Sequence, residues 1–465
     1  MNITPSSQVL CKKSLLYYKI LEGQEFIRES KRQGAYVILL TVTALEHAHW
    51  PRESINELFY MPDLSKTDEV IRGISYLART RIIDYIVALD DYDVWTAASL
   101  REHLRIPGMG DTTVRYFRDK LAMRLMAREH GIHVPDFIHV LNHDKIREYM
   151  AHIPPPWMLK PRSEASTIGI AKINTPEEFW PRIETLGDQQ SFYLLERYIP
   201  GEVYHVDSLI VDREVVFAEA HNYGRPPFNI FHEGGIFTTR TIPRASQEES
   251  TLKELNRQIV SAFGLVRGVT HTEFIKGHDD GRFYFLETAA RVGGANIAEL
   301  VEAATGINLW REWAKIELTS QDSAYQLPEP QQNYAGVIVS LARQEHPDTT
   351  AYQDPEIVMR LDRRHHAGFV IAAKDPDRVN SLLDEYTQRF ANDFLATLPP
   401  IESRPPSSDT WFPQNPLPTC LTNRVGAGAA WMSGGDACVA PALEPACPPI
   451  SETNLAASAI LLPEL

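Results

Sequence analysis

The chain has 465 residues, a length that suggests about three domains. Its hydrophobic content of 43% and charged content of 23% are typical of a folded globular protein, and they exclude an intrinsically disordered chain and a membrane protein. The net charge of −15 repels phosphate backbones and anionic lipids, so we expect no binding to nucleic acid or to a membrane surface. The longest apolar run, residues 36–45, is shorter than a bilayer span, and the N-terminus does not have the pattern of a signal peptide. We expect a cytoplasmic protein.

The end of the chain differs in composition from the rest. Residues 404–465 are rich in proline and poor in charge, and they show no sustained periodicity. Cys420, Cys438 and Cys447 lie there, whereas Cys11 is the one cysteine of the remaining chain. Their spacings match neither a disulfide framework for the folded part nor a structural zinc site. We predict a disordered tail.

The first 111 residues alternate between β and α patterns. Residues 36–41 and 85–89 have the apolar character of buried strands, and residues 23–32, 68–78 and 94–104 have helical spacing. This alternation predicts an open parallel α/β sheet. No GxGxxG motif follows the first strand, which argues against a nicotinamide or flavin site.

The rest of the chain predicts one long helix, a smaller α/β unit, a set of strands and a final helix. The expected elements are a helix at 112–130, strands at 137–141, 157–160, 168–173, 192–199, 204–211, 214–219, 269–274, 283–286, 334–341 and 356–361, and helices at 308–317 and 376–394. The turn-rich loop at 223–235 could line a substrate pocket or be a plain surface loop.

Glu273 and Glu287 lie on adjoining strands of a predicted hairpin whose tip is at residues 277–282. Because both are equally far from residue 280, an odd-numbered loop would place them directly across from each other, with Cβ atoms about 4.5–5.5 Å apart. A two-residue turn at Asp280-Gly281 would shift this register by one residue. Opposed carboxylates repel unless a cation such as Mg²⁺ lies between them or one is protonated. The pair is therefore either a metal site or two solvated glutamates.

Three cations could bind phosphate or another anion. Lys160 ends a strand and precedes a loop rich in hydroxyl groups, Lys120 lies in the predicted helix, and Arg291 precedes a Val-Gly-Gly turn. Each has an ordinary alternative: a polar hairpin loop, a solvated helix residue and a surface loop.

The order of these features along the chain resembles the ATP-grasp superfamily, and within it the branch of carboxylate–amine ligases and biotin carboxylases. The ordered features are Lys120, Lys160 with its loop, the Leu194–Glu202 stretch with His205 and Asp207, Glu273, and Glu287 to Arg291 with Gly-Gly after it. The resemblance covers about residues 9–400. It implies an α/β and α+β architecture in which an ATP-grasp fold follows the parallel α/β domain. The expected boundaries are 1–111 for that first domain, 112–320 for the ATP-grasp domain with a lid at about 135–190, 321–403 for a small C-terminal α+β subdomain, and 404–465 for the tail.

The resemblance also implies nucleotide-binding roles for individual residues. Lys120 and Lys160 would bind the α- and β-phosphates of ATP, with Ser163 in the loop beside Lys160. A backbone carbonyl and N–H of Glu196 and Ile199 would bind the adenine.

Roles for the ribose, the metal and the reacting groups follow from the same resemblance. Glu202 or His205 would reach the ribose. Glu273 and Glu287 would hold Mg²⁺ or Mn²⁺, and Arg291 would steady an acyl phosphate or tetrahedral intermediate.

Two departures from the family pattern affect this assignment. Family members usually have asparagine two residues after the second metal glutamate, but this chain has Ala289, so the missing ligand would be water or another side chain. The loop after Lys160 has a single glycine, Gly169, where relatives often have several, which predicts stiffer closure over the phosphates.

The leading hypothesis is an ATP- and Mg²⁺-dependent ligase that joins a small carboxylate to an amine. The partners would be small molecules, and a homodimer is compatible with the resemblance. Two alternatives stay open: a biotin carboxylase-like enzyme that activates bicarbonate, and a non-catalytic protein that binds ATP for regulation.

Overall fold

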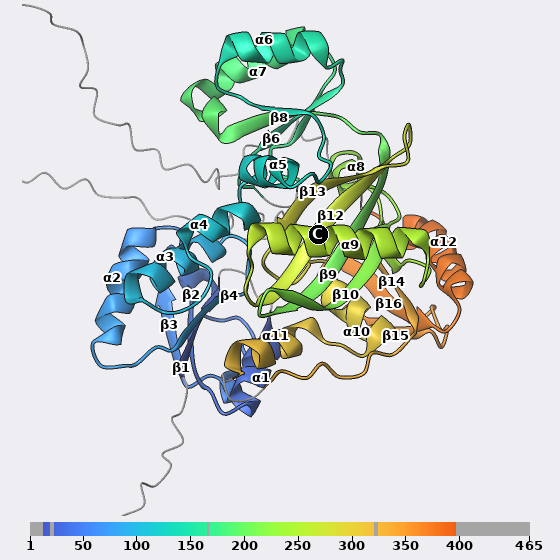
Figure 1. Ribbon diagram of the computed structural model, residues 1–465. Helices are drawn as coiled ribbons and strands as arrows, with labels where there is room; N and C mark the ends of the chain where they lie inside the picture. Colours follow the sequence, from blue (N-terminus) through green and yellow to red (C-terminus); the bar gives the residue numbers. More distant parts are fainter. Residues whose placement is uncertain (1–12, 19–22, 165–166, 320–323, 397–465) are drawn as a thin grey trace, which may run out of the picture. The chain divides into compact units, whose positions relative to one another are not determined.

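The computed structural model describes residues 13–18, 23–164, 167–319 and 324–396 (Figure 1). The tail predicted from residue 404 onward lies outside the described residues. Within them the chain forms three sheets: a parallel sheet in the order β3-β2-β1-β4, a lid sheet in the order β5-β8-β6-β7, and a large sheet in the order β13-β12-β9-β10-β11-β14-β16-β15.

The predicted parallel α/β sheet is present near the start of the chain. Its strands are β1 (Lys13–Tyr18), β2 (Tyr36–Val42), β3 (Glu57–Met61) and β4 (Tyr85–Ala88), and its helices are α1 (Gln24–Arg32), α2 (Thr67–Ala78) and α3 (Val94–Leu104). Alternate side chains of β2 enter two different cores, Val37 and Leu39 with α1, and Ile38 and Leu40 with α2 and α3. The sheet therefore has helices on both faces, as parallel sheets require.

The prediction of one helix at 112–130 is wrong in one respect, because the structure divides this segment into three pieces. The pieces are α4 (Asp111–Val114), the 3₁₀ turn η3 (Arg115–Phe117) and α5 (Lys120–Glu129). Asp119 has extended backbone and caps α5, accepting the N–H groups of Leu121 at 3.0 Å and Ala122 at 3.4 Å. The break makes Lys120 the first residue of a helix.

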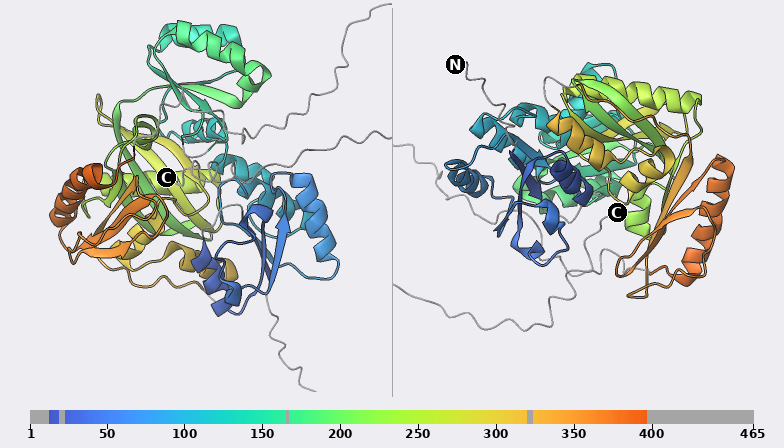
Figure 2. Two further views of the ribbon diagram at one scale, coloured as in Figure 1. Left: turned by 180° about the vertical axis from the view of Figure 1, so that it is seen from behind. Right: turned by 90° about the horizontal axis from the view of Figure 1, so that it is seen from below.

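The lid sheet is antiparallel and carries two helices. Its strands are β5 (Phe137–His139), β6 (Trp157–Pro161), β7 (Ala171–Ile173) and β8 (Tyr193–Arg197), and its helices are α6 (His143–His152) and α7 (Pro176–Leu186). Trp157, Leu159 and Leu195 pack against Ile146 of α6 and Phe179 of α7 in one core. Figures 1 and 2 show both helices over this sheet.

The large sheet is antiparallel throughout and carries four of the candidate site residues, Glu202, His205, Glu273 and Glu287. Its strands are β9 (Gly201–Val211), β10 (Glu214–Tyr223), β11 (Phe237–Thr241), β12 (Gly268–Gly277), β13 (Phe283–Ala289), β14 (Tyr334–Leu341), β15 (Ile357–Arg360) and β16 (His366–Ala373). The sequence patterns missed β3, β11 and β16. They also predicted that β10 ends at residue 219, whereas it extends to Tyr223.

Helices cover both faces of the large sheet. They are α8 (Pro227–Glu233), α9 (Gln247–Phe263), α10 (Ile297–Thr305), α11 (Leu309–Leu318) and α12 (Pro376–Asp393). Tyr204 and Phe274 pack with α9, whereas Leu209 and Val269, on the other face of the same strands, pack with α11. Glu273 shares the second face, because it alternates with Phe274.

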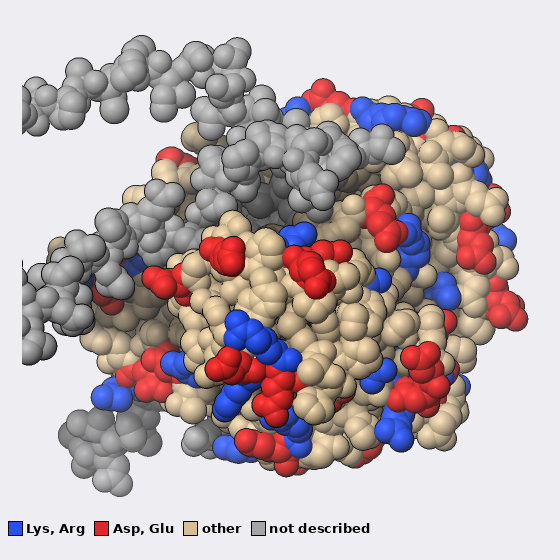
Figure 3. Space-filling model, turned by 90° about the horizontal axis from the view of Figure 1, so that it is seen from above, with Lys and Arg blue, Asp and Glu red and all other residues tan. Residues whose placement is uncertain are grey.

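No helix within the described ranges is both long and apolar enough to cross a membrane. On the face drawn in Figure 3, the acidic and basic side chains of the described residues are interspersed. That face therefore lacks the basic stripe that follows a nucleic-acid backbone.

Candidate functional site

Lys120 and Glu287 meet although 167 positions separate them. Lys120 Nζ lies 2.6 Å from Glu287 Oε2, and the lysine is 6% exposed. Glu287 keeps 35% of its side chain exposed. Burial acts to raise the pKa of Glu287, but Lys120 outweighs it, with help from Lys160 and Arg124, and the pKa falls to about 2. The carboxylate is therefore charged at neutral pH.

The loop after Lys160 is held against the start of α5. Three contacts fix it: Lys120 Nζ donates to the Glu164 carbonyl at 2.7 Å, Arg118 Nη2 donates to the Ser163 carbonyl, and Arg162 pairs with Asp119. Residues 165 and 166 of this loop lie outside the described part of the chain. The stiffer closure expected from the single glycine of this loop stays a prediction.

Lys160 shares a buried carboxylate with Arg124. Its Nζ pairs with Glu196 of β8, and Arg124 Nε lies 3.0 Å from the same carboxylate. Glu196 is 1% exposed. Burial would raise the pKa of Glu196, but Arg124 and Lys160 together hold it below its ordinary value. Lys160 is thus positioned by its ion pair with Glu196.

The prediction that Glu273 and Glu287 lie directly opposite each other is confirmed, but by another route than an odd-numbered loop. Gly277 N–H donates to the Arg282 carbonyl at 2.9 Å and closes an even-numbered loop. The ladder near the tip is therefore offset by one residue, in the opposite direction to the shift that a turn at Asp280-Gly281 would cause. A β-bulge at Leu286 then restores the pairing of Glu273 with Glu287.

Glu273 is anchored on the side away from the tip. Tyr223 O–H donates to its Oε1 at 2.9 Å, and His271 Nε2 lies 3.5 Å from the same oxygen. Glu273 remains 17% exposed. Two carboxylates on paired positions, one charged and one held by a hydroxyl, form a set of hard oxygen donors that suits Mg²⁺ or Mn²⁺.

Arg291 lies beyond Glu287, with its Nη1 donating to the Val292 carbonyl at 2.7 Å. Its charge also acts on the end of β4: burial and the neighbouring Asp91 raise the pKa of Asp90 to about 6, against the opposing effect of Arg291. The positive charge of Arg291 therefore lies close enough to Asp90 to favour its charged form.

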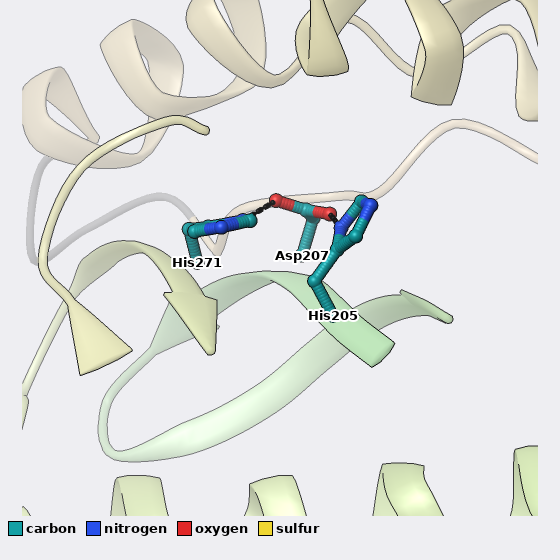
Figure 4. A group of neighbouring side chains, drawn as sticks. All are labelled: His205, Asp207 and His271. Atoms are coloured by element: carbon teal, nitrogen blue, oxygen red, sulfur yellow. Dashed lines mark hydrogen bonds and ion pairs between the residues drawn. The ribbon is translucent and has the colours of Figure 1, made fainter. Parts of the chain in front are cut away.

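Behind Glu273 lies a buried polar cluster, and Figure 4 shows three of its residues. Asp207 Oδ2 is 2.7 Å from His205 Nδ1, and Asp207 Oδ1 is 2.8 Å from His271 Nδ1. His205 Nε2 continues to Thr239 Oγ1 at 2.7 Å. His221 stacks on His205 with ring centroids 4.7 Å apart, and its Nδ1 lies 3.5 Å from Asp207. Burial acts to raise the pKa of Asp207, but His205 and His271 hold it well below the ordinary value.

Comparison with known families gives this geometry a context. The family model of the ATP-grasp domain matches residues 153–299. These residues form an ATP-grasp domain. Lys160, Glu196, Glu273, Glu287 and Arg291 lie within the match, and Lys120 precedes it.

The sequence similarity to known proteins reaches beyond the ATP-grasp domain and covers most of the described chain. An L-arginine-specific L-amino acid ligase of Bacillus subtilis is 23% identical over 309 residues, 64% of this chain and 73% of that protein. A D-alanine–D-alanine ligase of Thermotoga maritima is 28% identical over 198 residues, 37% of this chain and 60% of that protein.

Two solved structures share the fold. The crystal structure of an L-amino acid ligase from Bacillus licheniformis has a TM-score of 0.65 at 17% identity and covers 83% of this chain and 99% of its own. An N5-carboxyaminoimidazole synthetase from Staphylococcus aureus, complexed with ADP, has a TM-score of 0.63 at 16% identity and covers 82% of this chain and 97% of its own. The expected ATP-grasp architecture is therefore confirmed.

The ribose candidates of the ATP-grasp domain lie on opposite faces of β9. Glu202 accepts a hydrogen bond from Tyr204 O–H at 2.8 Å and pairs across the ladder with Lys276, whose side chain reaches Glu248 of α9. It therefore lies on the face away from Glu273. His205 shares the face of Glu273, but it is fully buried and both ring nitrogens are engaged. Neither side chain is available for a ligand beside Glu273 and Glu287, so we do not assign the ribose contact to either.

The adenine expectation remains a prediction for backbone groups. The side chain of Glu196 is committed to Lys160 and Arg124, and Ile199 is a buried residue just after β8. Ser163 offers a carbonyl that already accepts from Arg118, and its hydroxyl stays a candidate for phosphate.

Sequence reasoning missed the acidic turn that follows β4. Asp90 and Asp91 are buried there. Arg118 pairs with Asp91 and also donates to the Ser163 carbonyl in the loop after Lys160, which we call the lid loop. A signal was available, since ligands of open α/β sheets bind outside the carboxyl ends of the strands. The candidate loop at 223–235 is also more regular than expected, because it contains the short helix α8.

The buried His221 gives the ATP-grasp domain an acid-sensitive stability. Burial lowers the pKa of His221 to about 4 despite the nearby Asp207, whereas an unfolded histidine titrates near 6.5. Between these values the unfolded chain binds one more proton than the fold, so stability falls as the pH falls from about 6.5 to about 4. We expect His221→Phe to remove a loss on the order of 3 kcal/mol over this window. Urea unfolding of both proteins at pH 7 and pH 4.5 tests this, and parallel losses would contradict it.

Proposed function

We propose that this chain is an ATP-dependent ligase that activates a small carboxylate as an acyl phosphate and joins it to an amine, with amino acids as the substrate class. The observation that carries the proposal is the convergence of Lys120 on Glu287, directly across the ladder from Glu273. The likeness to amino acid ligases in sequence and in fold supports it.

The residues suit the charge changes of this reaction. ATP carries about four negative charges, and an attacking carboxylate adds another, so cations must surround the phosphates. Lys120 and Lys160 would bind phosphate oxygens, each exchanging part of its contact with Glu287 or Glu196. Glu273 and Glu287 would hold Mg²⁺, which when bound neutralises phosphate charge and polarises the transferred group.

The later half of the reaction depends on other parts of the site. An acyl phosphate hydrolyses readily, so the lid loop held by Arg118 and Arg162 would serve to exclude water. Attack by the amine on the acyl carbon forms a tetrahedral oxyanion, to which we assign Arg291; its collapse breaks the carbon–oxygen bond to phosphate and yields the amide, inorganic phosphate and the proton lost by the amine. ATP as a substrate also fits the cytoplasmic location expected from the composition.

An assay of ADP release tests the proposal. The protein is given ATP and Mg²⁺, and pooled amino acids, pooled hydroxy acids or bicarbonate are added in separate reactions. We expect release that requires amino acids and a product with a new amide bond in the mass spectrum. Release that depends on bicarbonate alone would support the carboxylase alternative. ATP binding without turnover on any pool would support the regulatory alternative and contradict the ligase.

A further inference from the structure

The acidic turn that follows β4 lies beside the cations of the candidate site. Asp90 and Asp91 come just after the carboxyl end of this parallel strand, where open α/β sheets bind their ligands. Arg118 pairs with Asp91 through Nη1, and its Nη2 donates to the Ser163 carbonyl. Lys120, two residues later, binds the next carbonyl of the same lid loop. The turn is therefore fixed close to the lysine that meets Glu287.

Two carboxylate oxygens of this turn have no hydrogen-bond partner within the described part of the chain. They are Asp90 Oδ2 and Asp91 Oδ1, on residues that are 5% and 9% exposed. The second oxygen of each is engaged, Asp90 Oδ1 by the N–H of Tyr92 at 2.6 Å and Asp91 Oδ2 by Arg118. A buried carboxylate oxygen without a donor is costly. The pair therefore calls for a donor from outside the chain.

The electrostatics of Asp90 favour a cationic donor. Burial raises the pKa of Asp90 most and the neighbouring Asp91 adds to this, so the pKa lies at about 6 although Arg291 and Arg118 oppose the rise. The buried Asp93 places a third carboxylate in the same turn. A bound cation would offset this negative charge and keep Asp90 and Asp91 ionised.

An amino acid carries the two charges that this part of the site matches. In the proposed reaction its carboxylate is activated beside Arg291, and its α-ammonium is bonded to the adjoining carbon. Arg291 acts on Asp90, so a cation for the carboxylate and an anion for the ammonium are neighbours. An ammonium has three donors, enough for both open oxygens. The amine of the acceptor, by contrast, must be uncharged when it attacks, so it gains less from these anions.

We propose that Asp90 and Asp91 bind the α-ammonium group of the amino acid whose carboxylate becomes the acyl phosphate. This inference rests on the proposed function and names the group by which the site distinguishes an amino acid from another small acid. A hydroxyl in place of the ammonium loses charge-assisted hydrogen bonds. The wild-type protein should therefore have a KM at least about tenfold lower for an amino acid than for the 2-hydroxy acid with the same side chain.

The test uses excess hydroxylamine as the acceptor, which traps the acyl phosphate as a hydroxamate and takes the acceptor amino acid out of the assay. The probes are the most active amino acid of the pool and its 2-hydroxy counterpart, followed by inhibition where the latter is not activated. In Asp90→Asn, which keeps the shape of the side chain, KM for the amino acid should rise at least about tenfold, and the constant for the hydroxy acid should change less than about twofold. Glu29→Gln is the matched control, because this carboxylate of α1 is 3% exposed and pairs with Arg32 at 3.0 Å. Both constants should stay unchanged there.

The outcomes separate this inference from the ligase proposal. Equal rises for both acids in Asp90→Asn would mean that the carboxylate only supports the turn, and would overturn the inference. An unchanged KM for the amino acid would overturn it as well, and a raised KM for the acceptor amine would then assign the turn to the acceptor. The wild-type protein decides the matter even if the variant fails to fold. Equal constants for the two acids overturn the inference and leave the ligase standing, whereas no hydroxamate from any amino acid contradicts both.

Discussion

Replacing Glu287 by glutamine is expected to reduce Mg²⁺-dependent ADP release at least about 100-fold while leaving the fold intact. Glutamine keeps the shape of the side chain and removes its charge. That charge is present at neutral pH, because Lys120 holds the pKa of Glu287 at about 2. The loss should therefore come from metal and phosphate binding, since Lys120 retains its contact with the Glu164 carbonyl.

The measurement is steady-state ADP release over a range of Mg²⁺ concentrations, beside circular dichroism and urea unfolding. Glu248→Gln is a suitable control, because this glutamate also pairs with a lysine, Lys276, at 2.6 Å but lies on the α9 side of the large sheet. We expect nearly wild-type activity in that control. Wild-type activity in Glu287→Gln would exclude Glu287 as a metal ligand.

Replacing Arg124 by methionine is expected to lower the free energy of unfolding by about 3–5 kcal/mol, the cost of breaking a buried ion pair. Arg124 is 0% exposed and binds Glu196, which is 1% exposed and would keep Lys160 as its remaining partner. Arg124 Nη1 also donates to the carbonyl of Leu286, the residue of the β-bulge. The substitution therefore affects both the stability of the domain and the register of Glu287.

Urea unfolding gives the change in stability, and Mn²⁺ affinity in the folded variant reports on the register. Arg128→Met is the matched control, because Arg128 lies one turn later on α5, is exposed, and stacks over Phe137 at 4.6 Å. We expect a cost below about 1 kcal/mol there. Equal costs in the two variants would mean that the buried ion pair contributes little to the fold.

Local periodicity predicted much of the fold. The strand at Tyr36–Val42 and the helices at Thr67–Ala78 and Pro376–Asp393 were expected nearly at their observed bounds, because one-sided or complete burial leaves a repeat in the sequence. The break before Lys120 was missed, since Asp119 reads as an ordinary helix residue until its side chain is seen to cap α5.

The register of β12 and β13 could not be obtained by counting residues in the sequence. Counting from the hairpin tip gives Glu287 or Thr288 as the partner of Glu273, depending on the turn, whereas the ladder next to the observed loop would give Leu286. The bulge at Leu286 corrects the register, and it is fixed by Arg124 from a helix far away in the chain. Alternation alone, by contrast, could have separated Glu202 from His205, because three positions along a strand lead to opposite faces.

The sequence by itself determined the parallel α/β sheet, the two glutamates on one hairpin and the order of the cations along the chain, and its resemblance to ATP-grasp enzymes implied the rest of the architecture. These depend on local repeats and on residue types, which can be read without coordinates. Only the tertiary structure decided which charges meet: Lys120 with Glu287, and Lys160 with Glu196. The reason is physical, because an ion pair or a metal site depends on distances of a few ångström between side chains. Packing of separate elements sets those distances, and no local pattern records them.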